Sequence, residues 1–242
     1  REFIALGVPV DLVLLRGSGE LLNEIPDGVR LVALTDGRDR GKARQLALAA
    51  FLPMLRYLRR DPPVAILSTL TGTNLFALLT RALAGVDTRL VLREAAPLVN
   101  SGSWRRRMLM RLGYRHADVV VAVARGIAND MSGLGVPATR LRVINNPVDL
   151  VALRGKAAVD LGVPGLGELR LPLVLSVGRL VKQKDYGTLL RAFARLRKTI
   201  AAQLLILGEG PCRAELEAVV AELGIGDDVF LPGHVGNPYP AF

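Results

Sequence analysis

Short runs of Val, Leu and Ile alternate along this chain with longer stretches whose apolar residues recur at helical spacing. The runs are continuously apolar, as in strands whose two faces are both covered by helices. This alternating order favours an α/β fold with a parallel, doubly wound sheet. We expect strands at 10–15, 31–34, 64–68, 90–93, 119–122 and 142–144, with helices between them at 42–60, 73–84, 103–115 and 125–134.

A turn-rich cluster at 145–149, NNPVD, interrupts this order, and a stretch with Pro and Gly follows at 163–167. A second series then begins, with strands at 173–177, 203–207 and 229–231 and helices at 185–198 and 212–223. We predict two Rossmann-like domains at 1–150 and 169–242, joined by a linker over 151–168. The chain starts with Arg and ends in a loop-like NPYPAF, so we expect truncation at both ends, a missing first strand and an incomplete second sheet.

The composition narrows the classes of partner. The net charge is +10, and residues 1–150 hold 21 Lys and Arg against 13 Asp and Glu. Such a basic half suits an anionic membrane surface, a phosphate-rich substrate or nucleic acid; the alternative is a set of solvated helix faces. With only 5% aromatic residues, nucleic acid is not expected as a partner. One cysteine and two histidines also favour neither a metal site nor a disulfide.

Residues 173–189, LVLSVGRLVKQKDYGTL, combine an apolar strand, a cationic turn and the start of a helix. Arg179 and Lys184 supply two positive charges, and the helix N-terminus supplies free N–H groups and its dipole. This pattern indicates a diphosphate site, although it is neither a P-loop nor a dinucleotide fingerprint. The alternative is a pair of surface cations. Glu209 follows the next strand and is a candidate acceptor for sugar or ribose hydroxyls, against a plain turn.

The segments GRLVKQKDYGTLLRAF and LLILGEGPCRAELEAVVAELGIGDDVFLPGHV closely resemble the nucleotide-sugar-binding domain of family 4 glycosyltransferases, also called glycosyl transferases group 1. Upstream, HADVVVAVARGIANDM and LRVINNPVDL resemble the end of the acceptor-binding domain and the linker. The resemblance implies the two-domain GT-B fold. It also implies retaining transfer of a sugar from a UDP- or GDP-sugar to a glycan or lipid-linked acceptor, without a metal or cofactor. The expected setting is bacterial surface polysaccharide synthesis, in the cytoplasm or on the inner face of the membrane.

The resemblance also implies roles for residues of the second domain. Arg179 and Lys184 match the positions that hold the donor diphosphate, and Gly178 would let the backbone approach it. The segment around Glu209 and Gly210, together with Val235, would contact the nucleoside or the sugar. The family's acidic EX7E-type motif is expected beyond the end of this chain, so we expect the chain as given to be an inactive, truncated part of a glycosyltransferase. The alternative function is a non-catalytic nucleotide-sugar-binding protein or an inactive fragment.

Two segments of the first domain carry candidate acceptor residues. Many relatives place a histidine at the cleft end of a central strand, but here RLVLREAAP ends in Arg93 and Glu94. Glu94 is the candidate catalytic residue and Arg93 a candidate phosphate contact; the alternative is an ion pair between these neighbours. Thr73 lies in the TGTN segment that opens a helix, where it either contacts acceptor or donor or belongs to a simple N-cap.

The helix predicted at 103–115 is basic and amphipathic. Arg107, Arg111 and Arg115 recur every four residues and therefore share a face. Trp104, Met108 and Leu112 form an apolar stripe. Such a helix can lie on anionic lipid. The alternative is a surface helix that packs its apolar stripe onto the sheet.

Overall fold

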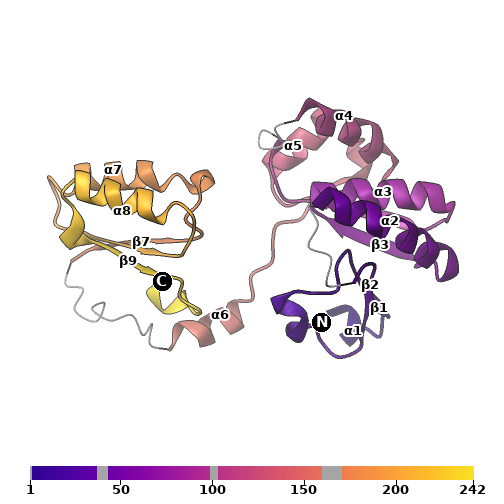
Figure 1. Cartoon of the computed structure of the whole chain (residues 1–242), viewed down its shortest axis with the longest axis horizontal. Coiled ribbons are helices and arrows are strands. Elements are labelled where there is room, and N and C mark those ends of the chain that lie inside the picture. Colours follow the sequence, from indigo (N-terminus) through magenta and orange to yellow (C-terminus); the bar gives the residue numbers. More distant parts are fainter. Residues whose placement is uncertain (1, 37–42, 99–102, 160–170) are drawn as a thin grey trace. The chain divides into compact units, whose positions relative to one another are not determined.

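The computed structural model describes residues 2–36, 43–98, 103–159 and 171–242 and divides into two compact units, 1–146 and 147–242 (Figure 1). Every strand pairing in both units is parallel. The predicted α/β fold with parallel sheets is therefore confirmed. All the expected helices and strands are present, with ends that lie within two residues of the predicted ones.

The first unit alternates strands and helices. Its elements are α1 (Glu2–Ala5), β1 (Val10–Leu14), η1 (Glu20–Glu24), β2 (Val29–Ala33), α2 (Ala43–Arg60), β3 (Ala65–Thr69), α3 (Thr71–Ala84), β4 (Arg89–Glu94), α4 (Trp104–Gly113), η3 (Tyr114–His116), β5 (Val119–Ala122), α5 (Arg125–Gly133), η4 (Ala138–Arg140) and β6 (Leu141–Val143).

The strands of the first unit lie in two sheets rather than in the single sheet expected. One is the pair β1–β2, and the other has the order β3-β4-β5-β6. The pair is held by contacts with α2 instead of by pairing with β3. Tyr57 of α2 donates a hydrogen bond to Asp11 of β1 at 2.7 Å, and Arg30 of β2 donates to the same carboxylate at 2.8 Å. The Arg30 guanidinium lowers the pKa of the Asp11 carboxyl, since it stabilises the charged form.

The second unit has a three-stranded sheet of order β7-β8-β9, and α7 and α8 lie side by side over one of its faces (Figure 1). Its elements are α6 (Leu150–Ala157), β7 (Leu173–Val177), η6 (Lys182–Lys184), α7 (Tyr186–Leu196), β8 (Gln203–Leu207), α8 (Arg213–Glu222), η7 (Gly226–Asp228), β9 (Val229–Gly233) and η8 (Tyr239–Ala241).

Helix α6 was not predicted. It occupies the first part of the stretch that was expected to be a linker. Its N-cap is Asp149, whose carboxylate accepts a hydrogen bond from the Ala152 N–H at 2.9 Å. Asn237 donates to the Lys156 carbonyl at 2.8 Å and so ties α6 to the segment after β9. Residues 160–168 of the predicted linker lie outside the described residues.

Each unit has its own hydrophobic core. In the first unit, the largest cluster lies between the β3–β6 sheet and helices α3, α4 and α5, and includes the fully buried Leu90, Leu92 and Met131. In the second unit, the core lies between the sheet and helices α7 and α8. β8 is its central strand, and Leu204 to Leu207 are buried on both faces, as expected for a covered parallel strand.

Candidate functional site

The carboxyl ends of the three strands of the second unit lie in register. Val177 of β7 pairs with Leu207 of β8, and Leu207 pairs with Gly233 of β9. The loops that leave these strands therefore start at the same edge of the sheet, where open α/β sheets bind their ligands. We call the segments 178–180, 208–210 and 233–235 at this position the glycine-lined edge.

Backbone hydrogen bonds join the three segments of the glycine-lined edge. The Gly178 N–H donates to the Leu207 carbonyl at 2.9 Å, and the Gly208 N–H donates to the Gly233 carbonyl at 2.8 Å. The Leu180 N–H donates to the Glu209 carbonyl at 3.0 Å. The motifs that the sequence places some 25 to 30 residues apart are thus brought together into one rigid surface.

Glycine is required at this edge because backbone packs directly on backbone. A Cβ atom on Gly208 would lie 2.8 Å from the Gly178 carbonyl carbon and closer still to its oxygen. A Cβ on Gly210 would lie 2.8 Å from both the carbonyl carbon and the nitrogen of Leu180. Gly178 is less restricted, since its Cβ would lie 3.1 Å from the Tyr186 hydroxyl.

Two cations flank this edge without a protein partner. Arg179 lies two residues after the end of β7, and Lys184 is the last residue of η6; both are exposed, and the described residues offer neither side chain a hydrogen bond or ion pair. The Lys184 Nζ lies 3.8 Å from the position of a Cβ on Gly178. Helix α7 begins directly after Asp185, so the N–H groups of its first turn, at Tyr186 and Gly187, lack helical acceptors. This arrangement can hold an anion.

Glu209 is fixed beside the end of β9 by a residue that the sequence analysis missed. Arg213 donates to the Glu209 carboxylate at 2.8 Å and to the Leu231 carbonyl at 2.7 Å, and it also pairs with Glu217 at 2.8 Å. The Glu209 carboxylate lies 3.3 Å from the position of a Cβ on Gly233. Its side chain remains half exposed and can still accept a hydroxyl donor. The four-residue spacing of Glu209, Arg213 and Glu217 is the sequence signal that could have identified the pairings.

The structure places Gly210 and Val235 in the same edge, both partly buried. Val235 follows Gly233, the last residue of β9, by two positions. All six residues that we predicted for the donor therefore lie on the three segments of this one edge or on the turn beside it. Their contacts with a donor stay a prediction.

Glu94, the candidate catalytic residue, lies at the carboxyl end of β4 with 1% of its surface exposed. Its carboxylate accepts hydrogen bonds from the Thr71 hydroxyl at 2.8 Å, the Tyr114 hydroxyl at 2.7 Å and the Asn74 amide at 3.4 Å. Burial, and then the Glu94 charge, raise the pKa of Tyr114 well above its ordinary value. These contacts favour a role in fixing α3 and η3 to β4; catalysis by Glu94 stays a prediction.

The ion pair that was considered between Arg93 and Glu94 is absent from the described residues. Successive side chains of a strand point to opposite faces. Arg93 instead donates to the Thr69 hydroxyl at 2.9 Å and to the Asn146 side-chain oxygen at 2.6 Å, which leaves it at the carboxyl edge of the sheet. The phosphate contact predicted for Arg93 stays a prediction.

The simple N-cap expected for the TGTN segment is wrong. Helix α3 starts at Thr71, and its N-cap position is Leu70, which offers no side-chain acceptor. Leu70 has a φ of 73°, which is unusual for a residue with a branched side chain. The Thr73 hydroxyl donates to the Leu70 carbonyl at 2.9 Å and also to the Thr69 carbonyl, so it stabilises this strained turn.

Helix α4 presents its predicted apolar stripe to solvent and does not bury it against the sheet. Trp104, Met108 and Leu112 are exposed, and Met110 is the residue of α4 that is buried. The expectation that the apolar stripe packs onto the sheet is therefore wrong. Arg107, Arg111 and Arg115 are also exposed.

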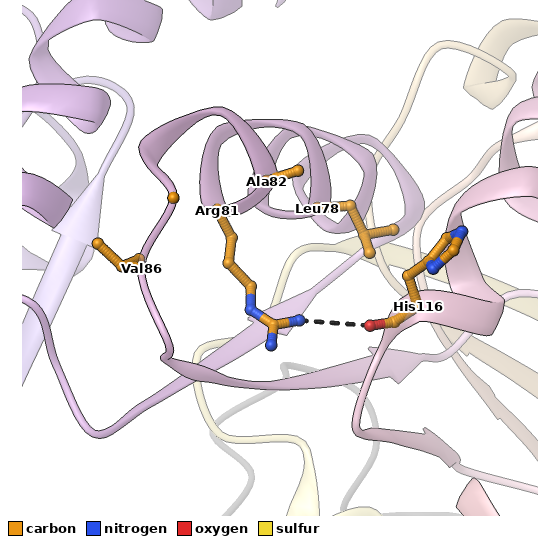
Figure 2. Close-up of a pocket in the computed structure, with 6 residues that line it drawn as sticks. Leu78, Arg81, Ala82, Val86 and His116 are labelled. Carbon is orange, nitrogen blue, oxygen red and sulfur yellow. Dashed lines mark hydrogen bonds between the residues drawn. The ribbon is translucent and has the colours of Figure 1, made fainter.

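A shallow pocket lies at the end of the β3–β6 sheet that is opposite to Arg93 and Glu94 (Figure 2). It is lined by the last turn of α3 and by His116, and Arg81 donates to the His116 carbonyl at 3.3 Å. Arg81 also pairs with Asp118 at 3.3 Å. Because these residues precede β4 and β5, the pocket is at the amino ends of the strands, away from Arg93 and Glu94. We assign it a structural role.

No group of three or more His, Cys, Asp or Glu side chains within the described ranges could hold a metal ion. In the same ranges, no helix has the length and hydropathy needed to cross a bilayer.

The sequence matches two protein families. Residues 1–147 match the family described as Glycosyl transferase 4-like domain, and residues 167–240 match Glycosyl transferases group 1. A Campylobacter jejuni relative, the N-acetylgalactosamine-N,N'-diacetylbacillosaminyl-diphospho-undecaprenol 4-alpha-N-acetylgalactosaminyltransferase, is 34% identical over 177 residues, which cover 70% of this chain and 46% of the relative. The lipopolysaccharide core biosynthesis glycosyltransferase LpsE of Rhizobium meliloti is 33% identical over 131 residues, 54% of this chain and 36% of LpsE. The chain thus spans less than half the length of these two relatives.

Solved structures share the fold. Anabaena HepE in complex with UDP and glucose superposes with a TM-score of 0.73 at 16% identity, over 96% of this chain and 63% of HepE. The lipopolysaccharide outer core galactosyltransferase WaaB gives 0.61 at 20% identity, over 88% of this chain and 55% of WaaB. At such identities the likeness concerns the fold, which is that of the GT-B proteins.

Proposed function

This chain belongs to the family 4 glycosyltransferases, and from that premise we propose that it transfers a sugar from a UDP- or GDP-sugar to a lipid-linked or glycan acceptor. The observation that carries the proposal is the pair of unpartnered cations, Arg179 and Lys184, at the glycine-lined edge. A nucleoside diphosphate carries the charge that would pair with them. The partly exposed Glu209 lies at the same edge, ready to accept hydroxyl groups of the donor.

The proposed reaction needs stabilisation of a leaving group. The bond between the anomeric carbon and the β-phosphate oxygen breaks, and that oxygen keeps the electron pair. The anomeric carbon forms a new bond with an acceptor hydroxyl oxygen, whose proton is released. Negative charge therefore grows on the diphosphate, where Arg179, Lys184 and the N-terminus of α7 would oppose it. Retention of the anomeric configuration is part of the proposal and is carried over from the family resemblance.

The names of relatives support the choice of substrates. The Campylobacter jejuni relative is named for an acceptor linked through a diphosphate to undecaprenol, and HepE was crystallised with UDP and glucose. By analogy we propose a polyprenol-diphosphate-linked or lipopolysaccharide-type acceptor for this chain. Arg93, partly buried at the carboxyl edge of β4, is the residue that we propose for a phosphate of the acceptor.

A transfer assay tests the proposal. The complete gene product is incubated with radiolabelled UDP- and GDP-sugars and lipid-linked acceptors, and both nucleotide release and sugar incorporation are measured. Arg179→Ala and Lys184→Ala should each lower donor turnover by about 10- to 100-fold, since each removes a charge-assisted contact. Lys182→Ala is the matched control, because Lys182 is an exposed lysine of the same turn.

Two outcomes would contradict the proposal. Full turnover in both Arg179→Ala and Lys184→Ala would remove the assigned site. Tight nucleotide binding without turnover on any donor and acceptor would favour a nucleotide-sugar-binding protein instead.

A further inference from the structure

Helix α4 presents an apolar surface to solvent. We call Trp104, Met108 and Leu112 the outward stripe. Their exposed fractions are 71%, 48% and 49%, and Leu109 beside them is 56% exposed. An isolated exposed leucine needs no explanation, but a contiguous patch of this kind marks an interaction surface.

The outward stripe results from the way in which α4 is anchored. Met110, 1% exposed, lies about 160° around the helix from Met108. Gly113 allows a close approach to α3, because a Cβ there would lie 3.1 Å from a methyl group of Leu78. Tyr114 directly after α4 is fully buried and donates to Glu94 at 2.7 Å. The stripe therefore cannot turn inward without breaking these contacts.

Positive charge surrounds the outward stripe. Residues 104–116, WRRRMLMRLGYRH, contain five arginines and no acidic residue. Arg107 and Arg111 lie along one side of the stripe, and Arg115 continues that row in η3. On the other side, the Arg105 guanidinium lies 5.7 Å from the centre of the Trp104 ring. A cationic rim around Trp, Met and Leu complements a surface with an apolar interior and anionic head groups.

We propose that α4 docks on an anionic phospholipid bilayer, with the outward stripe in the acyl boundary and the arginines at the lipid phosphates. The helix would lie in the interface, since its ten residues span about 15 Å, half the thickness of the hydrocarbon core. The amphipathic match favours lipid over a second copy of the chain, because Arg105, Arg107, Arg111 and Arg115 would face their own copies in a symmetric contact. This proposal goes beyond sugar transfer and does not depend on it.

Vesicle binding gives a direct readout, because Trp104 is the single tryptophan of the 242-residue chain. The full chain is mixed with vesicles of phosphatidylcholine containing 30% phosphatidylglycerol, or of phosphatidylcholine alone. We expect a shift of the Trp104 emission to shorter wavelength, and co-sedimentation, with the anionic vesicles. Lipids brominated along the acyl chain should quench the emission.

Variants separate charge from apolar contact. Each arginine removed near an anionic surface should weaken binding about fivefold, so Arg107→Ala, Arg111→Ala and Arg115→Ala together should weaken it on the order of 100-fold. Met108→Asp should weaken binding at least tenfold while preserving the fold, since the residue is exposed. The matched controls are in the second unit: Val151→Asp, 83% exposed, and the double change Arg191→Ala with Arg195→Ala on α7.

Three results would overturn the proposal. The first is equal binding to both kinds of vesicle, and the second is binding that is unaffected by Met108→Asp. The third is formation of a dimer in the absence of lipid, with the Trp104 emission already shifted to shorter wavelength. UDP binding by Met108→Asp is measured in parallel, because its persistence distinguishes a failure of membrane docking from a failure of the proposed transferase site.

Discussion

Gly208 and Gly210 are the positions where one methyl group would disturb the second unit most. Their backbones contact Gly178 and Leu180 directly, and Cβ atoms there would overlap backbone atoms that are tied by hydrogen bonds. The edge can relax only if the loops separate. The backbone of the glycine-lined edge is thus held in place without a ligand, which lowers the entropic cost of binding.

We predict that Gly208→Ala lowers the free energy of unfolding by about 2–4 kcal/mol. The measurement is urea denaturation followed by far-UV circular dichroism. Gly236→Ala is the matched control, because no atom lies within 4 Å of its Cβ position, and it should change stability by less than about 0.5 kcal/mol. Equal stability of the two variants would show that the backbone contact at Gly178 is not made.

Tyr114 couples three elements of the first unit through its hydroxyl group. It donates to Glu94 of β4 and accepts from Asn74 of α3 at 3.2 Å, while its own backbone continues from α4. All three side chains are buried. Removing one hydroxyl from such a network leaves a buried carboxylate with one donor fewer. These hydrogen bonds of the Tyr114 hydroxyl explain why α4 keeps its orientation.

We predict that Tyr114→Phe lowers the free energy of unfolding at pH 8 by about 1–3 kcal/mol. Tyr239→Phe, whose hydroxyl makes no hydrogen bond within the described residues, should lower it by less than about 0.5 kcal/mol. Thermal denaturation of both variants and the wild type provides the comparison. A Tyr114→Phe variant as stable as the wild type would show that the hydroxyl contributes nothing to holding α4.

The raised pKa of Tyr114 also predicts the behaviour at alkaline pH. The unfolded tyrosine ionises near pH 10, and the folded one ionises at higher pH. The stabilisation is therefore complete below about pH 10 and is lost as the pH rises further. Burial raises the pKa of Tyr57 to about 12, so this tyrosine adds to the loss. Between pH 9 and 11, Tyr114→Phe should lose less stability than the wild type.

Helices and strands with strong apolar periodicity could be predicted from the sequence, whereas the side of a helix that is buried could not. The apolar runs of β7 and β8 and the helical spacing of α3 and α7 determine these elements locally. The stripe of Trp104, Met108 and Leu112 was visible as well. Periodicity cannot tell which side of a helix is buried, and here Met110 and Tyr114 decide it through tertiary contacts.

The positions of the residues proposed to bind the sugar donor could be predicted better from the sequence than the surroundings of those proposed for the acceptor. Arg179 and Glu209 each lie two residues after the end of a strand, and the carboxyl ends of parallel strands meet at one edge. Glu94 is also at the carboxyl end of a strand, but the hydrogen-bond donors around it come from α3 and η3 and could not be anticipated. The hydrogen bonds of Arg93 with Thr69 and Asn146 likewise join segments far apart in the sequence.

The two units also divide the charge of the molecule. Of the 32 Lys and Arg residues, 21 lie in residues 1–150, which include α4, whereas the second unit carries the two unpartnered cations of the glycine-lined edge. We therefore assign lipid attraction to the first unit and nucleotide binding to the second. The proposed reaction depends on the second assignment.

Titration calorimetry of UDP and GDP into the full chain tests that assignment most directly. We predict binding of at least one nucleotide with one site per chain. Affinity should fall about 10- to 100-fold in Lys184→Ala and remain unchanged in Lys182→Ala. Heat of binding that is absent for both nucleotides, or an affinity that Lys184→Ala and Lys182→Ala change equally, would contradict the assignment of the glycine-lined edge as a nucleoside diphosphate site.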